Sequence, residues 1–578
     1  MLARTNENED FVMSQDDSYN GKTKFIFITG GVLSGLGKGI AAASIGSLLS
    51  RFKVVPVKCD GYLNIDPGTM NPIEHGEVFV LDDGGEVDMD FGHYERFLNI
   101  KGKKEWSLTM GKVFDTLLKS EREGKYAGKT VQFIPHVTDV IKNHFFKIAD
   151  NENADILLVE IGGTVGDLEN EFFIEAARQL FHIVGSENCL FAHLTYIPIP
   201  KGTKEQKSKP TQMSIHDLNE RGIYPDVIIG RCEEMLTQKI KEKIALYGNI
   251  PTKNVISEID VDSVYEIPIG FQEEGMLDIV LKKLRITMPS VANQEMDDWK
   301  RLVDVCKQNN KNPRKTLNIA ICGKYTQLED SYASIHEALK HAAAHLNVKC
   351  KFEMIDTEKT DTIEEIKVQL AKVDAVIVPG GFGSRGIEGK ILVVQVAREL
   401  KIPFLGICYG MQLAVVEFAR NKCGIKGANT AEVSADGIDV KDAIIDILPG
   451  KRGLPLGDTL RKGGQDVFLK SGSLAAKIYG AELIRERFRH RYEVNHDYVK
   501  RIEEHGLVFS GRSVKEENIM QMMEIPEHPF FVGCQFHPEL TSTLLKPSPL
   551  FYNLLKMAEV RFDYRLEELH ILDAKNLR

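Results

Sequence analysis

Long hydrophobic runs are missing from this sequence. Across its 578 residues no apolar stretch approaches the roughly 20 residues needed to cross a bilayer, so we expect no membrane span. Residues 1–20 carry five acidic side chains and no apolar block, which excludes a secretory signal and predicts a disordered tail over 1–21. We therefore expect a cytoplasmic protein.

Excess positive charge and paired cysteines are also lacking. Lys and Arg total 73 against 83 Asp and Glu, and the formal net charge of −10 argues against a general nucleic-acid or membrane-surface binder. The nine cysteines form no C-x-x-C pair, so neither a zinc site nor a disulfide framework is expected. The remaining composition, 43% hydrophobic and 27% charged, is that of a globular protein long enough for more than one domain.

Short apolar runs alternate with amphipathic stretches through most of the chain. In the first half this predicts strands at 25–29, 54–58, 131–134, 155–160, 190–197 and 227–229, with helices at 39–51, 137–149, 171–183 and 233–247. In the second half it predicts strands at 317–321, 349–355 and 373–378, with helices at 330–346, 361–371 and 389–400. Such alternation is typical of an α/β fold with mostly parallel, doubly wound sheets.

The pattern breaks between the two halves, where residues 307–315 include no apolar side chain. We therefore predict a domain over 22–290, a linker over 291–315, a second domain over 316–561 and a charged C-terminal tail over 562–578.

One stretch of the second domain has the pattern of a catalytic turn. An apolar strand, 402–407, leads into Cys408, and a helical pattern follows; Gly406 and Gly410 flank the cysteine. A sharp turn between strand and helix can expose a nucleophile, and a helix N-terminus favours the thiolate. A lone cysteine between glycines is more often only a small buried residue, so this pattern needs support from elsewhere.

That support comes from two further motifs. His537 in Phe-His-Pro-Glu is a candidate base for Cys408, and Glu539 is placed to orient the imidazole ring. The loop Pro379–Gly383 ends another apolar run and offers backbone N–H groups for an oxyanion hole. Together the three pieces resemble class I glutamine amidotransferases, which release ammonia from glutamine through a cysteine thioester.

The first domain has a glycine-rich loop at 30–39, between a strand and a helix, which predicts a phosphate cradle containing Lys38. It is not a strict Walker A sequence, because Val32 and Gly39 stand where a glycine and a Ser or Thr are usual. The missing hydroxyl implies that a metal is held elsewhere. Asp90 and Glu160 are the candidate Mg²⁺ ligands, although a helix cap or an ion pair would explain either carboxylate as well.

Several motifs together resemble the CTP synthase family: residues 30–44, 64–70, 75–79, 92–97, 159–167, 209–212 and 490–495. The resemblance extends from about residue 22 to 560. It implies a P-loop-like amidoligase domain followed by a class I glutamine amidotransferase domain. In this family ATP phosphorylates O4 of UTP, ammonia displaces the phosphate at C4, and CTP is formed.

The resemblance also implies the residues of each site. The glutaminase residues are Cys408, His537 and Glu539. The ATP site comprises Gly35, Leu36, Gly37, Lys38, Gly39, Ile40, Lys58 and Asp90, and the metal site comprises Asp90 and Glu160. The UTP and CTP residues are Ser34, Lys207, Ser208, Lys209, Pro210, Thr211, Gln212 and Lys243. Inhibitory CTP would also contact Asp167, Leu168 and Glu169. The glutamine site comprises Gly381, Tyr409, Gly410, Met411, Gln412, Glu432 and Arg491.

Regulation and assembly are likewise expected by resemblance. GTP would activate the enzyme through Arg461, CTP would be a feedback inhibitor, His75 would gate ammonia, and the protein would form homotetramers and filaments. Two other functions stay open: a different glutamine-fed, ATP-dependent amidoligase acting on a carboxylate, and a non-catalytic filament-forming homologue. The second would not need Lys38, Asp90, Glu160 and the glutaminase residues, all of which are present.

Overall fold

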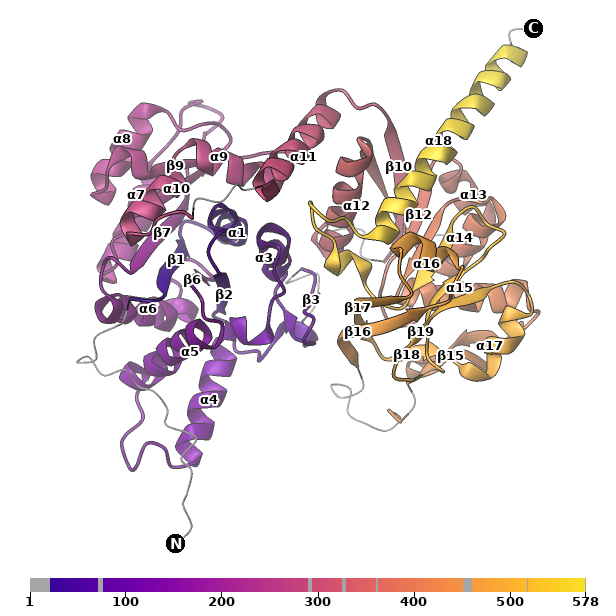
Figure 1. Ribbon diagram of the computed structural model, residues 1–578, viewed down its shortest axis with the longest axis horizontal. Coiled ribbons are helices and arrows are strands. Elements are labelled where there is room, and N and C mark those ends of the chain that lie inside the picture. The colour runs from indigo at the N-terminus through magenta and orange to yellow at the C-terminus, as the bar shows by residue number, and fades with distance from the viewer. Residues whose placement is uncertain are drawn as a thin grey trace. The chain divides into compact units, whose positions relative to one another are not determined.

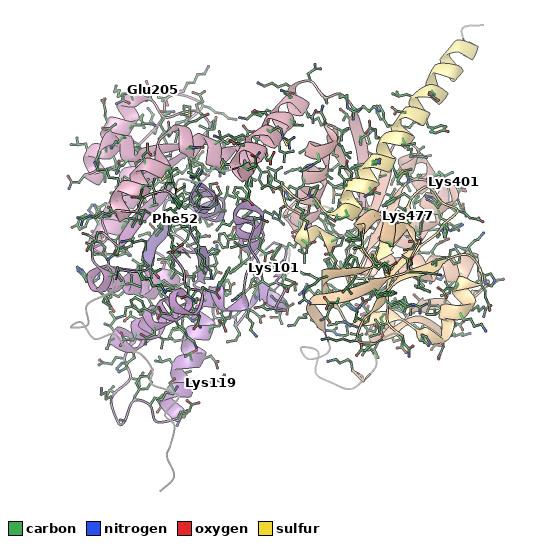
Figure 2. All side chains as sticks on the ribbon, in the orientation of Figure 1. Phe52, Lys101, Lys119, Glu205, Lys401 and Lys477 are labelled. Atoms are coloured by element: carbon green, nitrogen blue, oxygen red, sulfur yellow. The ribbon has the colours of Figure 1, made fainter. Side chains whose placement is uncertain are left out.

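A computed structural model of the chain describes residues 21–70, 76–289, 294–324, 329–359, 362–448, 450–451, 460–516 and 518–576. Residues 1–20 of the tail predicted over 1–21, and the candidate gate His75, lie outside these ranges. Within them, every helix is too short or too polar to span a bilayer. Long charged side chains such as Lys119, Lys401 and Lys477 are exposed, as Figure 2 shows.

The chain divides into two compact units, and neither is a single continuous stretch. Unit 1 contains residues 1–69 and 90–293, and unit 2 contains residues 70–89 and 294–578. The described residues 70 and 76–89, which lie inside the predicted first domain, thus belong to the second unit. Most of the predicted linker forms helix α11 (Gln294–Lys311), which buries Trp299, Leu302 and Val303 at helical spacing.

Unit 1 is built on a seven-stranded parallel sheet with helices on both faces (Figure 1). The strand order is β5 (Ser107–Thr109), β2 (Val54–Asp60), β6 (Ile156–Ile161), β1 (Lys24–Gly30), β7 (Cys189–Tyr196), β8 (Val227–Cys232) and β9 (Val255–Ile259). The central strands are buried along nearly their whole length, which explains why they appear in the sequence as continuous apolar runs.

Two groups of helices cover this sheet. The first contains α1 (Lys38–Leu48), α3 (Asp90–Leu98), α9 (Ile267–Glu273) and α10 (Met276–Leu284), which pack around α1. The second contains α4 (Met110–Arg122), α5 (Thr138–Asn151) and α6 (Glu171–Val184), which pack around α5. Helices α7 (Lys209–Glu220) and α8 (Gln238–Gly248) pack against each other beyond β7.

One predicted strand of unit 1 is wrong. Residues 131–134 form no strand, and a short irregular helical turn, η3 (Phe133–Val137), runs into α5 instead. Phe133 and Ile134 are both more than half exposed, so this apolar run does not belong to the sheet core. Pro135 also removes a backbone donor, which disfavours a central strand.

Unit 2 contains a nine-stranded mixed sheet. Its parallel part is β11 (Lys349–Asp356), β10 (Thr316–Gly323), β12 (Ala375–Val378), β13 (Phe404–Ile407) and β21 (Phe531–Cys534). The sheet continues, antiparallel, through β20 (Met520–Glu524), β19 (Val508–Ser513), β16 (Arg461–Leu469) and β17 (Leu483–His490). A small sheet, β14 (Ala428–Thr430), β15 (Asp442–Ile447) and β18 (Tyr492–Val494), lies beside it.

The two faces of the larger sheet have separate hydrophobic cores. Along β10, Ile319 and Ile321 contribute to one core and Ala320 and Cys322 to the other, as the alternation of a strand requires. One face is covered by α12 (Ala333–Leu346) and α18 (Pro549–Asn576), and the other by α13 (Ile363–Leu370), α14 (Ile387–Glu399) and α15 (Tyr409–Asn421) (Figure 1). Helices α16 (Leu474–Tyr479) and α17 (His496–Glu503) lie in the antiparallel half.

Candidate active sites

Cys408 occupies the turn between β13 and α15, with backbone angles of φ 51° and ψ −103°. A positive φ is uncommon for a residue with a side chain, so this is the strained turn that the sequence predicts. The backbone N–H of Cys408 donates to the carbonyl of Cys534, 2.7 Å away, which ties the turn to the neighbouring strand β21. The residue is only 5% exposed.

His537 and Glu539 follow β21 and lie beside this turn. Nδ1 of His537 is 2.7 Å from Oε1 of Glu539, and Nε2 is buried with no hydrogen bond to any described residue. A Cβ added to Gly380 would be 3.0 Å from Cε1 of His537 and 3.7 Å from Cβ of Cys408, so imidazole and thiol flank the same glycine. Burial alone would lower the pKa of His537, but Glu539 and Cys408 outweigh burial and raise it well above the usual value. An imidazole oriented by a carboxylate beside a cysteine is the arrangement of a base that can take the thiol proton.

The sulfur of Cys408 has two contacts that the sequence analysis missed. The amide of Gln535 donates to Sγ over 3.4 Å, and the thiol in turn donates to the backbone carbonyl oxygen of Arg489, 3.6 Å from Sγ. Gln535 stands two residues before His537 and could have been found as part of that motif. Arg489 could not, because only the folded strand β17 brings its carbonyl to the nucleophile.

Most candidate glutamine residues gather around the start of α15. Tyr409 donates its hydroxyl to the carbonyl of Gly383 over 2.9 Å, and Oε1 of Glu432 accepts from the N–H of Gly383 over 3.0 Å. The amide of Gln412 donates to the carbonyl of Tyr492 over 2.7 Å. Burial raises the pKa of Glu432, while Arg491 is near enough to oppose this shift. The carboxylate of Glu432 and the guanidinium of Arg491, which are expected to bind the amino-acid end of glutamine, therefore lie near one another.

The other candidates in this group are glycines and a buried methionine. Gly410 and Met411 lie in the first turn of α15 and are buried. Gly381 is in the loop after β12, where an added Cβ would be 3.4 Å from Nζ of Lys390 and 3.7 Å from the ring of Tyr409.

Lys390, on α14, is a second residue that the sequence analysis missed. Its side chain is almost fully buried, and its Nζ lies 5.3 Å from the centre of the Tyr409 ring. Burial, together with the nearby charge of Lys324, lowers the pKa of Lys390 to about 8. A buried cation beside the glycine-rich loop adds positive potential where an oxyanion would form.

In unit 1 the glycine-rich loop joins β1 to α1 as predicted. Ser34 and Gly35 are exposed, Leu36 is buried, and Gly37 caps α1 in the left-handed conformation with φ 95°. Lys38 and Gly39 are buried in the first turn of the helix, which continues through Ile40. Nζ of Lys38 donates to the carbonyl of Gly163 over 2.8 Å, and burial lowers the pKa of this lysine.

The two candidate metal ligands converge on one cation. Nζ of Lys58 is 2.7 Å from Oε1 of Glu160 and also forms an ion pair with Asp90. Burial raises the pKa of Glu160, whereas at Asp90 burial is outweighed by Lys58, which lowers the pKa. Asp90 begins α3 and Glu160 lies in β6, so separate elements bring the two carboxylates together. Both carboxylates thus form the ion pair that the sequence analysis left open, and the buried Glu160 and the partly exposed Asp90 are also oxygen donors of the kind that Mg²⁺ prefers.

The same geometry explains the departure from the Walker A pattern at Gly39. A Cβ on this residue would be 2.1 Å from Oδ1 of Asp90, so no side chain fits. The space where a Ser or Thr hydroxyl would stand is filled by a carboxylate from α3. A carboxylate oxygen from another element therefore lies beside the loop at this position.

The candidate UTP residues lie mainly at the start of α7. Ser208 precedes the helix, Lys209 and Pro210 form its first turn, and Lys207 pairs with Glu205 over 2.9 Å. The hydroxyl of Thr211 is 3.1 Å from that of Thr195 in β7, and the Gln212 amide donates to Ser208 over 3.0 Å. Lys243 is exposed on α8.

The candidate inhibitor residues form the turn after β6. Asp167 accepts a hydrogen bond from the N–H of Thr164 over 2.8 Å, and Leu168 is 82% exposed. Glu169 is also exposed and lies beside Gly61, where an added Cβ would be 2.6 Å from Cβ of Glu169.

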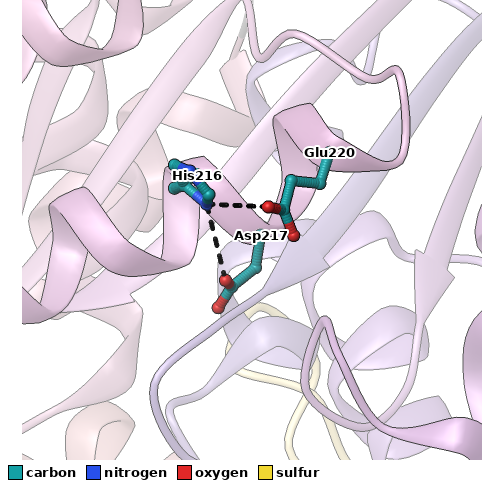
Figure 3. Close-up of side chains that lie close together, drawn as sticks. All are labelled: His216, Asp217 and Glu220. Carbon is teal, nitrogen blue, oxygen red and sulfur yellow. Dashed lines mark ion pairs between the residues drawn. The ribbon is translucent and has the colours of Figure 1, made fainter.

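Arg461 and one surface cluster complete the charged groups of interest. Arg461 begins β16, donates to the hydroxyl of Ser513 over 2.9 Å and lies 3.3 Å from Glu516. On α7, Nδ1 of His216 lies 3.5 Å from Glu220 and 4.0 Å from Asp217 (Figure 3). His216 and Glu220 are exposed and one helical turn apart, which is an ordinary surface ion pair.

Known proteins match both units. The family model for the CTP synthase N-terminus matches residues 24–286, and that for class-I glutamine amidotransferases matches residues 327–557. CTP synthase of Borreliella burgdorferi is 52% identical over 535 residues, which is 92% of this chain and 98% of that protein. CTP synthase of Thermococcus gammatolerans is 47% identical over 543 residues, 93% and 99% of the two chains. A solved glutaminase domain of Trypanosoma brucei CTPS with bound acivicin is 33% identical, covers 42% of this chain and 94% of its own, and has a TM-score of 0.40. Because such relatives are matched over nearly their full length, the chain belongs to the CTP synthase family.

Proposed function

We propose that this chain catalyses the ATP-dependent amination of UTP to CTP with ammonia taken from L-glutamine. The observation that carries the proposal is the pairing of two sites in one chain. Unit 2 has a strained cysteine beside a His–Glu pair, and unit 1 has a phosphate-type loop beside two converging carboxylates. Membership in the family supports the same assignment.

In unit 2, Cys408 is the nucleophile. His537 takes the thiol proton, the thiolate attacks the side-chain amide carbon of glutamine, and ammonia leaves after receiving a proton from the imidazolium. Water then hydrolyses the thioester to give glutamate and restores the thiol. Glu539 holds the imidazole by its Nδ1, over 2.7 Å, and stabilises its charged form. Glu432 and Arg491 would bind the ammonium and carboxylate groups of the substrate.

In unit 1, the γ-phosphoryl group of ATP is transferred to O4 of UTP, and ADP is released. Ammonia then attacks C4. Phosphate leaves with O4 and the electron pair of the C4–O4 bond, and loss of a proton gives CTP. Phosphorylation is needed because a carbonyl oxygen is otherwise a poor leaving group. Lys38 and the amides of the loop would hold the phosphates of ATP, with Lys58 near them. The UTP residues would be Ser34, Lys207 to Gln212 and Lys243.

Mg²⁺ would be held by Asp90 and Glu160. When bound, it would neutralise phosphate charge and orient the transferred group. The converging carboxylates support this assignment, since the donor set is one that Mg²⁺ prefers.

Regulation, assembly and location are proposed from the family alone. GTP would activate glutamine hydrolysis through Arg461, and CTP would inhibit at a site overlapping that of UTP and including Asp167, Leu168 and Glu169. A homotetramer, filaments and a cytoplasmic location remain predictions.

The substrate is tested by ammonia-driven ADP release. We expect ADP to appear from ATP only when UTP is added with Mg²⁺ and ammonia, and CTP to appear in equal amount. ADP release that needs a carboxylate substrate in place of UTP would identify a different amidoligase. No ADP release with either substrate would indicate a non-catalytic homologue.

A Gly39→Ala substitution should disturb the proposed metal site and leave the fold intact. The added methyl would clash with Oδ1 of Asp90 at 2.1 Å and displace the carboxylate, so ammonia-driven CTP synthesis should fall about a hundredfold. The matched control is Gly270→Ala, in helix α9, where an added Cβ has no neighbour within 4 Å. The control should retain activity and gain about 0.5–1 kcal/mol of helix stability. Equal activity of the two variants would show that Asp90 is not needed where the structure has it.

A further inference from the structure

A short hairpin from the first half of the chain packs on the antiparallel sheet of unit 2. It consists of β3 (Phe79–Val80) and β4 (Glu86–Val87). A hydrogen bond from the N–H of Leu81 to the carbonyl of Gly85, over 2.9 Å, closes the turn between them. Residues 70–89 belong to unit 2, although both neighbouring stretches of chain belong to unit 1.

Three alternate arginines of β17 hold the hairpin. Arg485 pairs with Asp82 over 3.0 Å, and Arg487 donates to the carbonyl of Val80 over 3.2 Å while its guanidinium lies 5.5 Å from the centre of the Phe79 ring. Arg489 donates to Oε1 of Glu86 over 2.9 Å. Residues two apart on a strand share a face, so the whole row is directed at the hairpin.

The neighbouring strand β16 fits the same contact. Gly464 lies opposite Arg487, and its N–H donates to the carbonyl of Asp82 over 2.8 Å. A Cβ on Gly464 would be 2.3 Å from Oδ1 of Asp82, so the close approach of the hairpin requires glycine here. Lys462 lies opposite Arg489 and pairs with Oε2 of Glu86 over 2.8 Å.

Glu86 is therefore a buried carboxylate between two cations from adjacent strands. Its side chain is only 5% exposed. Burial alone would raise the pKa of Glu86, but Arg489 and Lys462 outweigh burial and lower it, so the group stays ionised at neutral pH. Removing this charge would take from Arg489 and Lys462 the counter-ion that they share, although both side chains are about 30% exposed and water would weaken the resulting repulsion.

Arg489 connects this cluster to the nucleophile. Its side chain binds Glu86, while its backbone carbonyl oxygen lies 3.6 Å from Sγ of Cys408 and accepts a hydrogen bond from the thiol. Arg491, the candidate ligand for the carboxylate of glutamine, follows two residues later. A shift of Arg489 would therefore move both the acceptor at the sulfur and the chain that leads to the substrate site.

We propose that Glu86 is a positioning residue for the glutaminase reaction: through Arg489 it fixes the carbonyl that accepts a hydrogen bond from the Cys408 thiol. This rests on the proposed role of Cys408 and adds a residue from outside the glutaminase family match. Glu86 itself touches neither sulfur nor substrate. Its effect is on the orientation of Cys408 and hence on the rate of thioester formation.

The test is Glu86→Gln in the full chain, which keeps size and removes charge. With ATP, UTP, GTP and Mg²⁺ present, we expect kcat for glutamate release to fall about tenfold to a hundredfold, with a much smaller change in KM for glutamine. Ammonia-driven CTP synthesis should be unchanged. The rate of Cys408 alkylation by iodoacetamide, which needs no turnover, should change in the same variant.

Two further variants distinguish positioning from general loss of structure. Asp82→Asn removes the ion pair between the hairpin and Arg485, whose side chain is 43% exposed and which lies four residues before Arg489, and should leave kcat and alkylation unchanged. In an Arg489→Met background, Glu86→Gln should have little further effect, because the two residues act in series. Unchanged kcat in Glu86→Gln, an equal loss in Asp82→Asn, or additive effects in the double variant would each overturn the proposal. Absence of CTP synthesis by the unaltered protein would instead count against the proposed function, and alkylation would still report on Glu86.

Discussion

A Cys408→Ala variant should lose glutamine-driven CTP synthesis by about 10⁴-fold or more, because no other group can form the thioester. Synthesis from added ammonium should be unchanged, since Lys38, Asp90 and Glu160 lie on elements of unit 1. Both rates are measured as CTP formed from UTP, ATP and Mg²⁺, with glutamine or ammonium as the nitrogen source.

The matched control for this variant is Cys423→Ala. Cys423 is also a buried cysteine of unit 2 and is likewise 5% exposed, but it follows the C-terminal end of α15 rather than preceding its N-terminus. We expect the control to use both nitrogen sources normally. Loss of the ammonium reaction in a folded Cys408→Ala protein would falsify the division of chemistry between the two units.

A Lys38→Ala variant should lose synthesis from both nitrogen sources. Lys38 is the buried cation at the start of α1, in the loop proposed to bind ATP, so its removal takes away charge stabilisation from the phosphoryl transfer. We expect a fall of about 10²–10³-fold in CTP formation with ammonium as well as with glutamine. Alkylation of Cys408 by iodoacetamide should keep its normal rate.

The control here is Lys119→Ala, which removes a lysine from the exposed face of α4, where it pairs with Asp115 one turn away. Such a surface pair contributes little, so this variant should resemble the unaltered protein. If Lys38→Ala impaired the glutamine reaction alone, Lys38 would belong with ammonia release and not with phosphoryl transfer.

The catalytic turn and the parallel strands could be predicted because each has a local pattern. Strand 402–407, Cys408 and the following helix are consecutive, and the positive φ of Cys408 agrees with the expected sharp turn. The buried strands of the parallel sheet in unit 1 and of the parallel part of the sheet in unit 2 are continuous apolar runs, which can be recognised in the sequence. Residues 131–134 show the limit of this approach, since the same pattern there forms an exposed turn.

Contacts between distant segments could not be predicted in this way. That Asp90 fills the space beside Gly39 depends on how α3 packs against α1. The antiparallel strands β16 and β17 carry arginine, lysine and glycine where their faces receive the hairpin, so they lack the apolar alternation of a typical strand. Arg489 reaches Cys408 through its backbone carbonyl, for which any residue type would serve, and no motif can reveal such a role.

The discontinuity of unit 2 limits how it can be excised. A fragment beginning at residue 294 would contain the nine-stranded sheet and Cys408 but would lack residues 70–89. Arg485, Arg487 and Arg489 would then lose their contacts with Asp82, Val80 and Glu86. Cutting the chain between the two regions matched by the family models would thus remove Glu86 from Arg489, the residue of β17 whose backbone carbonyl contacts Sγ of Cys408.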